Sequence, residues 1–157
     1  MERKTKISAE DNRQEVTIMR EFDLPVDLLY KAYVEADIVA QWMNTKVLKL
    51  DCQPHGSYQF ETSDPHGNIM VRINGVFHEV VTEQRITRTF EMENTPFPVQ
   101  LEFLEFEKLT DDTSKLRMQI IYKSVEHRDQ MLKLPFAHGL NMAHNRLQEV
   151  ANPLKTI

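Results

Sequence analysis

The chain has 157 residues, a formal net charge of −5 at pH 7 and a single cysteine, Cys52. This length suits one domain with its own apolar core, and the negative charge argues against the basic face that non-specific nucleic-acid binding requires. One cysteine cannot form an internal disulfide, and no stretch resembles a signal peptide or a membrane span, so we expect a cytoplasmic protein.

The chain begins with polar and charged residues, and we predict a loose tail over residues 1–12 and a single domain over residues 13–157. The segment Glu15–Phe22 alternates apolar and polar residues, which indicates a half-buried strand. Two short helices are predicted after it. The second, Ile38–Met43, carries the only tryptophan, Trp42.

A long β region follows, in which apolar residues again alternate with polar ones. The predicted strands cover residues 48–52, 58–62, 69–80, 85–92, 99–109 and 116–122. After Gly75 the apolar set changes face, which predicts a β-bulge at the glycine. A similar slip is predicted in the fifth of these strands, from Leu101 and Phe103 to Leu104 and Phe106.

Ser124 is a predicted cap for a short helix over Val125–Met131, and a longer helix is expected from Pro135 to about Ala151. Its apolar residues recur every three or four positions, so Leu140 and Leu147 are expected to be almost fully buried. The order of elements predicts an α+β helix-grip fold. In it, a bent antiparallel sheet of about six or seven strands wraps around the long C-terminal helix, and a ligand pocket is expected between them.

Several motifs carry a resemblance to a known family. They are IMREFDLP at 18–25, IVAQW at 38–42, GVFHEV at 75–80, FEKL at 106–109 and the ending at 139–147. Their order, from about residue 13 to 152, resembles the family named for homology to the activator of heat-shock protein 90 ATPase, within the START-like (SRPBCC, Bet v-like) superfamily. The resemblance implies a helix-grip fold with a hydrophobic cavity, and the family's name suggests a chaperone as an alternative partner.

Motifs for chemistry are not found. The sequence has no glycine-rich phosphate loop, no nucleophile elbow and no HExxH, and its six histidines lack metal-ligand spacing. We therefore expect no metal and no cofactor, and we interpret Cys52 as a small buried apolar residue. The candidate cavity residues are Trp42, Tyr58, Phe60, Arg88, Met118, Leu140 and His144.

Two polar residues in this set are the most informative. Arg88 follows the phase of Ile86 and Phe90, so it should face inward with them unless the strand lies at an edge or has another register. His144 borders the buried stripe of the last helix, and the alternative is a boundary histidine with satisfied hydrogen bonds. For Trp42 the alternative to a cavity wall is a core anchor of the first helices.

The expected function is binding of a hydrophobic or amphipathic small molecule in the cavity, without bond chemistry. One alternative is a chaperone-associated interaction module. Another is a cyclase- or hydrolase-like enzyme that uses His144 as an acid or base, which requires a second polar group within hydrogen-bond reach.

Overall fold

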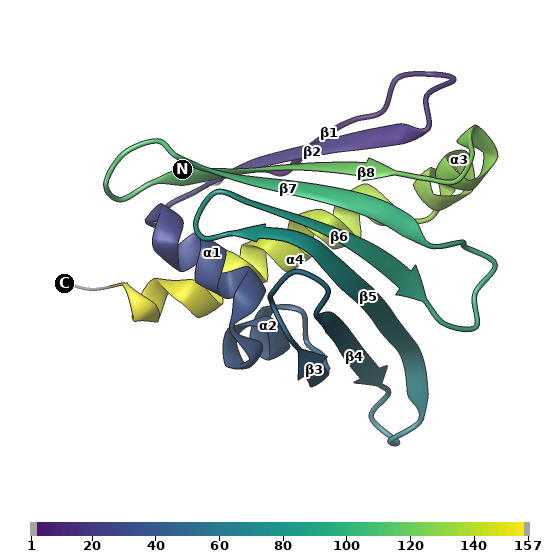
Figure 1. Ribbon diagram of the computed structural model, residues 1–157, viewed down its shortest axis with the longest axis horizontal. Helices are drawn as coiled ribbons and strands as arrows, with labels where there is room; N and C mark the ends of the chain where they lie inside the picture. The colour runs from purple at the N-terminus through teal and green to yellow at the C-terminus, as the bar shows by residue number, and fades with distance from the viewer. Residues whose placement is uncertain (1–2, 156–157) are drawn as a thin grey trace.

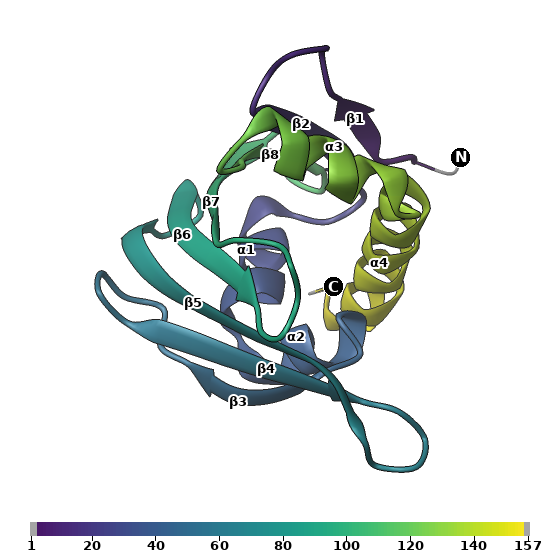
Figure 2. The same ribbon diagram turned by 90° about the vertical axis from the view of Figure 1, so that its right-hand side faces the viewer.

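The computed structural model describes residues 3–155, and within them one antiparallel sheet of eight strands curves around the helices (Figures 1 and 2). The strands are β1 (Lys6–Ser8), β2 (Glu15–Phe22), β3 (Lys46–Leu50), β4 (Ser57–Ser63), β5 (Ile69–Val81), β6 (Arg85–Met92), β7 (Gln100–Lys108) and β8 (Ser114–Ile121). Their order in the sheet is β1-β2-β8-β7-β6-β5-β4-β3.

The helices are α1 (Val26–Val34), α2 (Ala36–Trp42), α3 (Val125–Lys133) and α4 (Phe136–Ala151), and a 3₁₀ turn, η1 (Asn152–Leu154), follows α4. Figure 2 shows α1, α2 and α4 on the concave side of the sheet. This arrangement confirms the α+β helix-grip fold, with one strand more than the seven segments predicted as strands. Within residues 3–155, no helix combines the length and apolar character that a membrane crossing would need.

The additional strand, β1, lies in the segment predicted as a loose tail. Lys6–Ser8 pairs with β2, and Ile7 is partly buried against the core. The prediction missed this strand because three residues are too few to show an alternating pattern. The edge of β2 supplies the hydrogen-bond partners that hold the segment in place.

Gly75 has a different role from the one predicted. The pairing of β4 with β5 runs through Gly75 without interruption, and the register shift between β5 and β6 lies between Phe77 and Glu79. A Cβ atom at Gly75 would lie 2.3 Å from the ring of Tyr58 and 2.2 Å from the backbone oxygen of Thr89. The glycine therefore leaves room for the Tyr58 ring on the inner face.

The predicted change of phase in β7 is also wrong. Strand β7 alternates regularly, with Gln100, Glu102, Leu104 and Phe106 buried, and its pairings with β6 and β8 show no register shift. Two polar residues thus occupy inward positions at one end of the strand. Their inward direction is possible because Glu102 pairs with an arginine on the next strand and Gln100 donates to Glu102, as described below.

Burial along α4 is uneven. Leu147 and Ala151, in the C-terminal half, are 0% exposed, and Phe136, Leu140 and Ala143, toward the N-terminal end, are only partly buried. The expectation of nearly complete burial is confirmed for Leu147 and wrong for Leu140. The main backbone approaches of α4 are to α1, α2 and α3, whereas α1 approaches β7 and β8 directly.

Candidate functional site

A polar cluster lies on the inner face of the sheet, and we call Arg88, Gln100, Glu102 and Tyr122 the inner polar cluster. Arg88 on β6 is the register partner of Glu102 on β7, and its Nε donates to Glu102 Oε1 at 2.9 Å. The two side chains are 8% and 2% exposed. Gln100 Nε2 donates to Glu102 Oε2 at 2.7 Å, so both carboxylate oxygens are engaged.

Arg88 remains charged in this environment. Burial works against the cation, but the neighbouring Tyr58 and Glu102 raise the pKa of Arg88 overall. Its guanidinium carbon lies 5.3 Å from the centroid of the Tyr58 ring, a favourable cation–π position. The charge of Arg88 is balanced by Glu102, so this part of the inner face carries no net charge.

Tyr122 lies at the end of β8 and follows Ile121, which is paired with Leu101. The residue is 5% exposed, and its hydroxyl is buried without a hydrogen-bond partner among residues 3–155. Burial and, to a lesser extent, the nearby Glu102 raise the pKa of Tyr122, so the hydroxyl keeps its proton. A buried hydroxyl of this kind costs free energy until a partner accepts a hydrogen bond from it or donates one to it.

Among the predicted residues, Trp42 anchors the first two helices. Its Nε1 donates to the backbone oxygen of Ala32 at 2.6 Å, and its ring lies 5.1 Å from that of Tyr33. This placement matches the alternative of a core anchor. Tyr58 and Phe60 are buried neighbours on β4, with ring centroids 5.1 Å apart.

Met118 is 8% exposed on the buried face of β8. Leu140 packs against the core only in part. Arg88 is buried on the inner face of β6, as its alternation with Ile86 and Phe90 predicted. Four predicted residues, Tyr58, Phe60, Arg88 and Met118, thus belong to the buried face of the sheet.

His144 belongs to a different contact, where α4 meets the edge of the sheet. The ring is 1% exposed, with Nδ1 2.7 Å from the hydroxyl of Thr5 and its centroid 5.6 Å from that of Phe22. Burial and, to a lesser extent, the nearby Arg20 lower the pKa of His144 to about 3. The imidazole is therefore neutral near pH 7 and too weak a base for effective general acid–base chemistry.

Arg20, which the sequence pattern did not single out, connects β2 to α4. Its Nη2 donates to Asn145 Oδ1 at 2.8 Å, and its Nη1 lies 3.3 Å from both Asn141 Oδ1 and Thr5 Oγ1. This set of contacts joins the N-terminal segment, β2 and α4. His144 is thus part of a structural connection between α4 and β2, and β2 lies two strands away from β7 in the sheet order.

Nothing in the described residues favours metal or thiol chemistry. No group of three or more His, Cys, Asp or Glu residues within 3–155 could hold a metal ion. Burial raises the pKa of the Cys52 thiol to about 11, and its Sγ lies 3.7 Å from the backbone oxygen of Val34. Cys52 is therefore a protonated, weakly hydrogen-bonded thiol. It is only partly buried and follows the end of β3 at Leu50, whereas the sequence predicted a buried residue within the strand.

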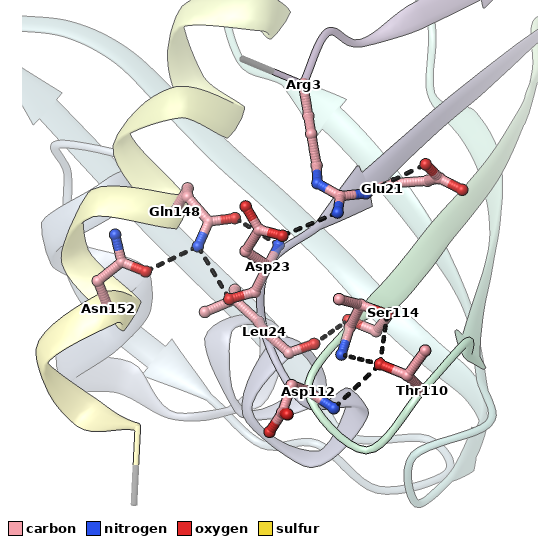
Figure 3. Close-up of polar contacts among 10 residues, drawn as sticks. Arg3, Glu21, Asp23, Leu24, Thr110, Asp112, Ser114, Gln148 and Asn152 are labelled. Atoms are coloured by element: carbon pink, nitrogen blue, oxygen red, sulfur yellow. Dashed lines mark hydrogen bonds and ion pairs between the residues drawn. The ribbon is translucent and has the colours of Figure 1, made fainter. Parts of the chain in front are cut away.

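Two grooves on the surface are alternative sites. The first, about 630 Å³, lies beside β1 and β2. Its Arg3 binds Glu21 at 3.1 Å and Asp23 at 2.8 Å, and both contacts are drawn in Figure 3. Gln148 on α4 accepts from the backbone nitrogen of Asp23 at 2.9 Å, which secures the end of β2. The second groove, about 580 Å³, includes Tyr58 but no other predicted residue.

Sequence reasoning missed Glu102, Gln100 and the open hydroxyl of Tyr122. The signal for Glu102 was present, because strict alternation backward from Phe106 and Leu104 places Glu102 and Gln100 on the inner face. The apolar residues Leu101 and Phe103, which alternate with them, suggested that the opposite face of β7 was the buried one.

Comparisons with known proteins agree with this fold. The sequence profile of the family described as "Activator of Hsp90 ATPase homolog 1-like protein" matches residues 23–152. A search among curated proteins finds no match.

Solved structures resemble the chain over nearly its whole length. A protein from Rhodobacter sphaeroides has a TM-score of 0.83 at 14% identity, covering 93% of this chain and 96% of that one. A protein from Nitrosomonas europaea has a TM-score of 0.78 at 20% identity, covering 94% of this chain and 100% of that one. At these identities the likeness concerns the fold alone.

Proposed function

Because the chain belongs to the family of Activator of Hsp90 ATPase homolog 1-like proteins, and because its inner face combines buried apolar side chains with open hydrogen-bonding groups, we propose that it binds a hydrophobic or amphipathic small molecule. The site lies between the inner face of the sheet and the N-terminal half of α4. The binding involves no bond chemistry.

The uneven burial of α4 is the observation that carries this proposal. Phe136, Leu140 and Ala143 are directed toward the core, yet they remain partly exposed. Leu147, about one turn after Ala143, is fully buried. Apolar side chains that are only partly covered leave free energy to be gained, about 25 cal/mol for each Å² that a ligand removes from water. Met118 on β8 supplies an apolar surface on the sheet.

The chemistry of the polar residues supports binding over catalysis. The enzyme alternative required His144 to act with a second polar group inside the pocket. His144 instead makes its contact with Thr5 at the edge of the sheet, and burial keeps it neutral. No contact described here favours the chaperone alternative.

The test uses 1-aminoanthracene, a neutral apolar fluorophore whose emission rises when it leaves water. We expect saturable binding to the wild-type protein. A Leu140→Trp variant should lose most of it, because the larger ring would occupy the proposed site beneath α4. The matched control is Met142→Trp, because Met142 is 45% exposed on the same helix and should tolerate the change without effect on binding.

Circular dichroism confirms that both variants are folded before they are compared. The proposal fails if the wild-type protein does not bind the fluorophore. It also fails if folded Leu140→Trp binds as tightly as Met142→Trp.

A further inference from the structure

The inner polar cluster leaves donor groups open on two residues, Arg88 and Tyr122. The one side-chain hydrogen bond that Arg88 makes within residues 3–155 uses Nε, so its Nη1 and Nη2 groups have no acceptor there. The Tyr122 hydroxyl has neither a donor nor an acceptor in the same part of the chain. Both residues are more than nine-tenths buried, and the hydroxyl of Tyr122 is itself fully buried, so bulk water does not readily satisfy it.

Most of the neighbouring polar groups are already used. Glu102 accepts from Arg88 on one oxygen and from Gln100 on the other. The hydroxyl of Tyr58 donates to the backbone oxygen of Thr89 at 2.5 Å. What the inner face still offers is therefore mainly donors, and a molecule that binds there must bring acceptor oxygens.

The charge of the cluster decides which acceptor is favoured. The cation of Arg88 is balanced by the carboxylate of Glu102 at 2.9 Å, and Gln100 and Tyr122 are neutral. The cation of Arg128, which also lies near Tyr122, is paired with Asp129 at 2.9 Å. A carboxylate ligand would enter a buried region without net positive charge and would lie near Glu102, which costs desolvation without a full counter-ion. A carbonyl oxygen can accept from a phenol or guanidinium N–H without that cost.

We propose that the ligand is a neutral molecule with an apolar body and a carbonyl oxygen, such as a ketone or ester, and that the Tyr122 hydroxyl donates a hydrogen bond to this oxygen. This inference rests on the proposed function. It replaces the sequence-based expectation that His144 orients the ligand, because the Nδ1 of His144 is engaged with Thr5.

The experiment measures displacement of 1-aminoanthracene at pH 7.5 by three compounds of nearly equal size. Undecane is purely apolar, 2-undecanone adds a carbonyl, and decanoate replaces the methyl group next to that carbonyl with a charged oxygen. We expect 2-undecanone to bind about tenfold more tightly than undecane, since it satisfies a buried donor. Decanoate should bind more weakly than 2-undecanone.

The variant Tyr122→Phe removes only the hydroxyl. It should weaken 2-undecanone about tenfold, to the level of undecane, and leave undecane binding unchanged. The matched control is Tyr30→Phe: Tyr30 is also buried but contacts Phe106, near the opposite end of β7 from Gln100. Tyr30→Phe should retain the preference for the ketone.

The outcomes separate the two proposals. If undecane displaces the fluorophore but 2-undecanone has no advantage, or decanoate binds most tightly, or Tyr122→Phe leaves ketone binding unchanged, the ligand class is wrong and the binding site stands. If the fluorophore does not bind, the proposed function fails and this inference fails with it.

Discussion

The buried ion pair between Arg88 and Glu102 gives a large and specific effect on stability. In Glu102→Gln the shape of the side chain is kept, but the guanidinium of Arg88, 8% exposed, loses its counter-ion. Removing one partner of a buried pair typically costs about 3–5 kcal/mol. Because the glutamine that replaces Glu102 still offers one acceptor to Arg88 Nε, we expect a loss near the lower end, about 3 kcal/mol.

The assay is urea unfolding at pH 7, followed by circular dichroism. The variant Arg88→Met and the double variant complete a cycle, and the double variant should cost clearly less than the sum of the two single ones because the buried cation is absent. Glu79→Gln is the matched control, since Glu79 binds Arg85 at 2.7 Å with both side chains about half exposed. Equal losses in Glu102→Gln and Glu79→Gln, or strict additivity in the cycle, would refute the reasoning.

Three further predictions concern the fold. The pKa of His144 is lowered to about 3 in the folded state, from an ordinary value of about 6.5. Between these two pH values the unfolded chain binds more protons than the folded one, so each unit by which the pH is lowered reduces stability by up to about 1.4 kcal/mol. Urea unfolding should therefore show a smaller loss between pH 7 and pH 5 in His144→Leu than in the wild type; equal losses would exclude this role. Gly75→Ala should lower stability by about 2 kcal/mol or more, because its Cβ would lie 2.2 Å from a backbone oxygen. Gly139→Ala, with nothing within 4 Å of its Cβ, should be neutral or stabilising. Thermal unfolding compares the two variants, and a less stable Gly139→Ala would be inconsistent with the packing. Leu147→Ala should cost about 2–5 kcal/mol and Leu140→Ala less, because only Leu147 is completely buried; comparable denaturation midpoints for the two variants would contradict this.

The sequence predicted the elements well where one local pattern was sufficient. Glu15–Phe22 alternates without interruption, and the structure has a strand with the same bounds. The Oγ of Ser124 accepts from the backbone nitrogen of His127, as expected for a helix cap. Alternation and capping depend on near neighbours in the chain, so they can be read without knowledge of the fold.

The inner polar cluster could be predicted only in part. The direction of Arg88 followed from its apolar neighbours, but its partner did not, because Leu101 and Phe103 made the opposite face of β7 look like the buried one. A carboxylate inside a core breaks the binary pattern and becomes reasonable only once an arginine is placed beside it. That pairing joins residues 14 positions apart on different strands.

The N-terminal contacts were beyond sequence reasoning for a related reason. Thr5 meets His144 and Asn141, which follow it by 139 and 136 residues. Neither a short polar segment nor a boundary histidine carries a pattern that reveals such a distant partner. The sequence made His144 either a cavity residue or a boundary histidine with satisfied hydrogen bonds, and in the structure its Nδ1 lies 2.7 Å from the hydroxyl of Thr5.

The central claim, a ligand site between the sheet and α4, is tested most directly by contacts between a ligand and methionine methyl groups. Met118 is 8% exposed, and Met70 and Met142 are 71% and 45% exposed. In protein labelled with ¹³C at the methionine methyls, 2-undecanone should give nuclear Overhauser effects to Met118 and none to Met70 or Met142. Effects confined to the exposed methyls, or none at the highest soluble concentration of ligand, would contradict the proposed site.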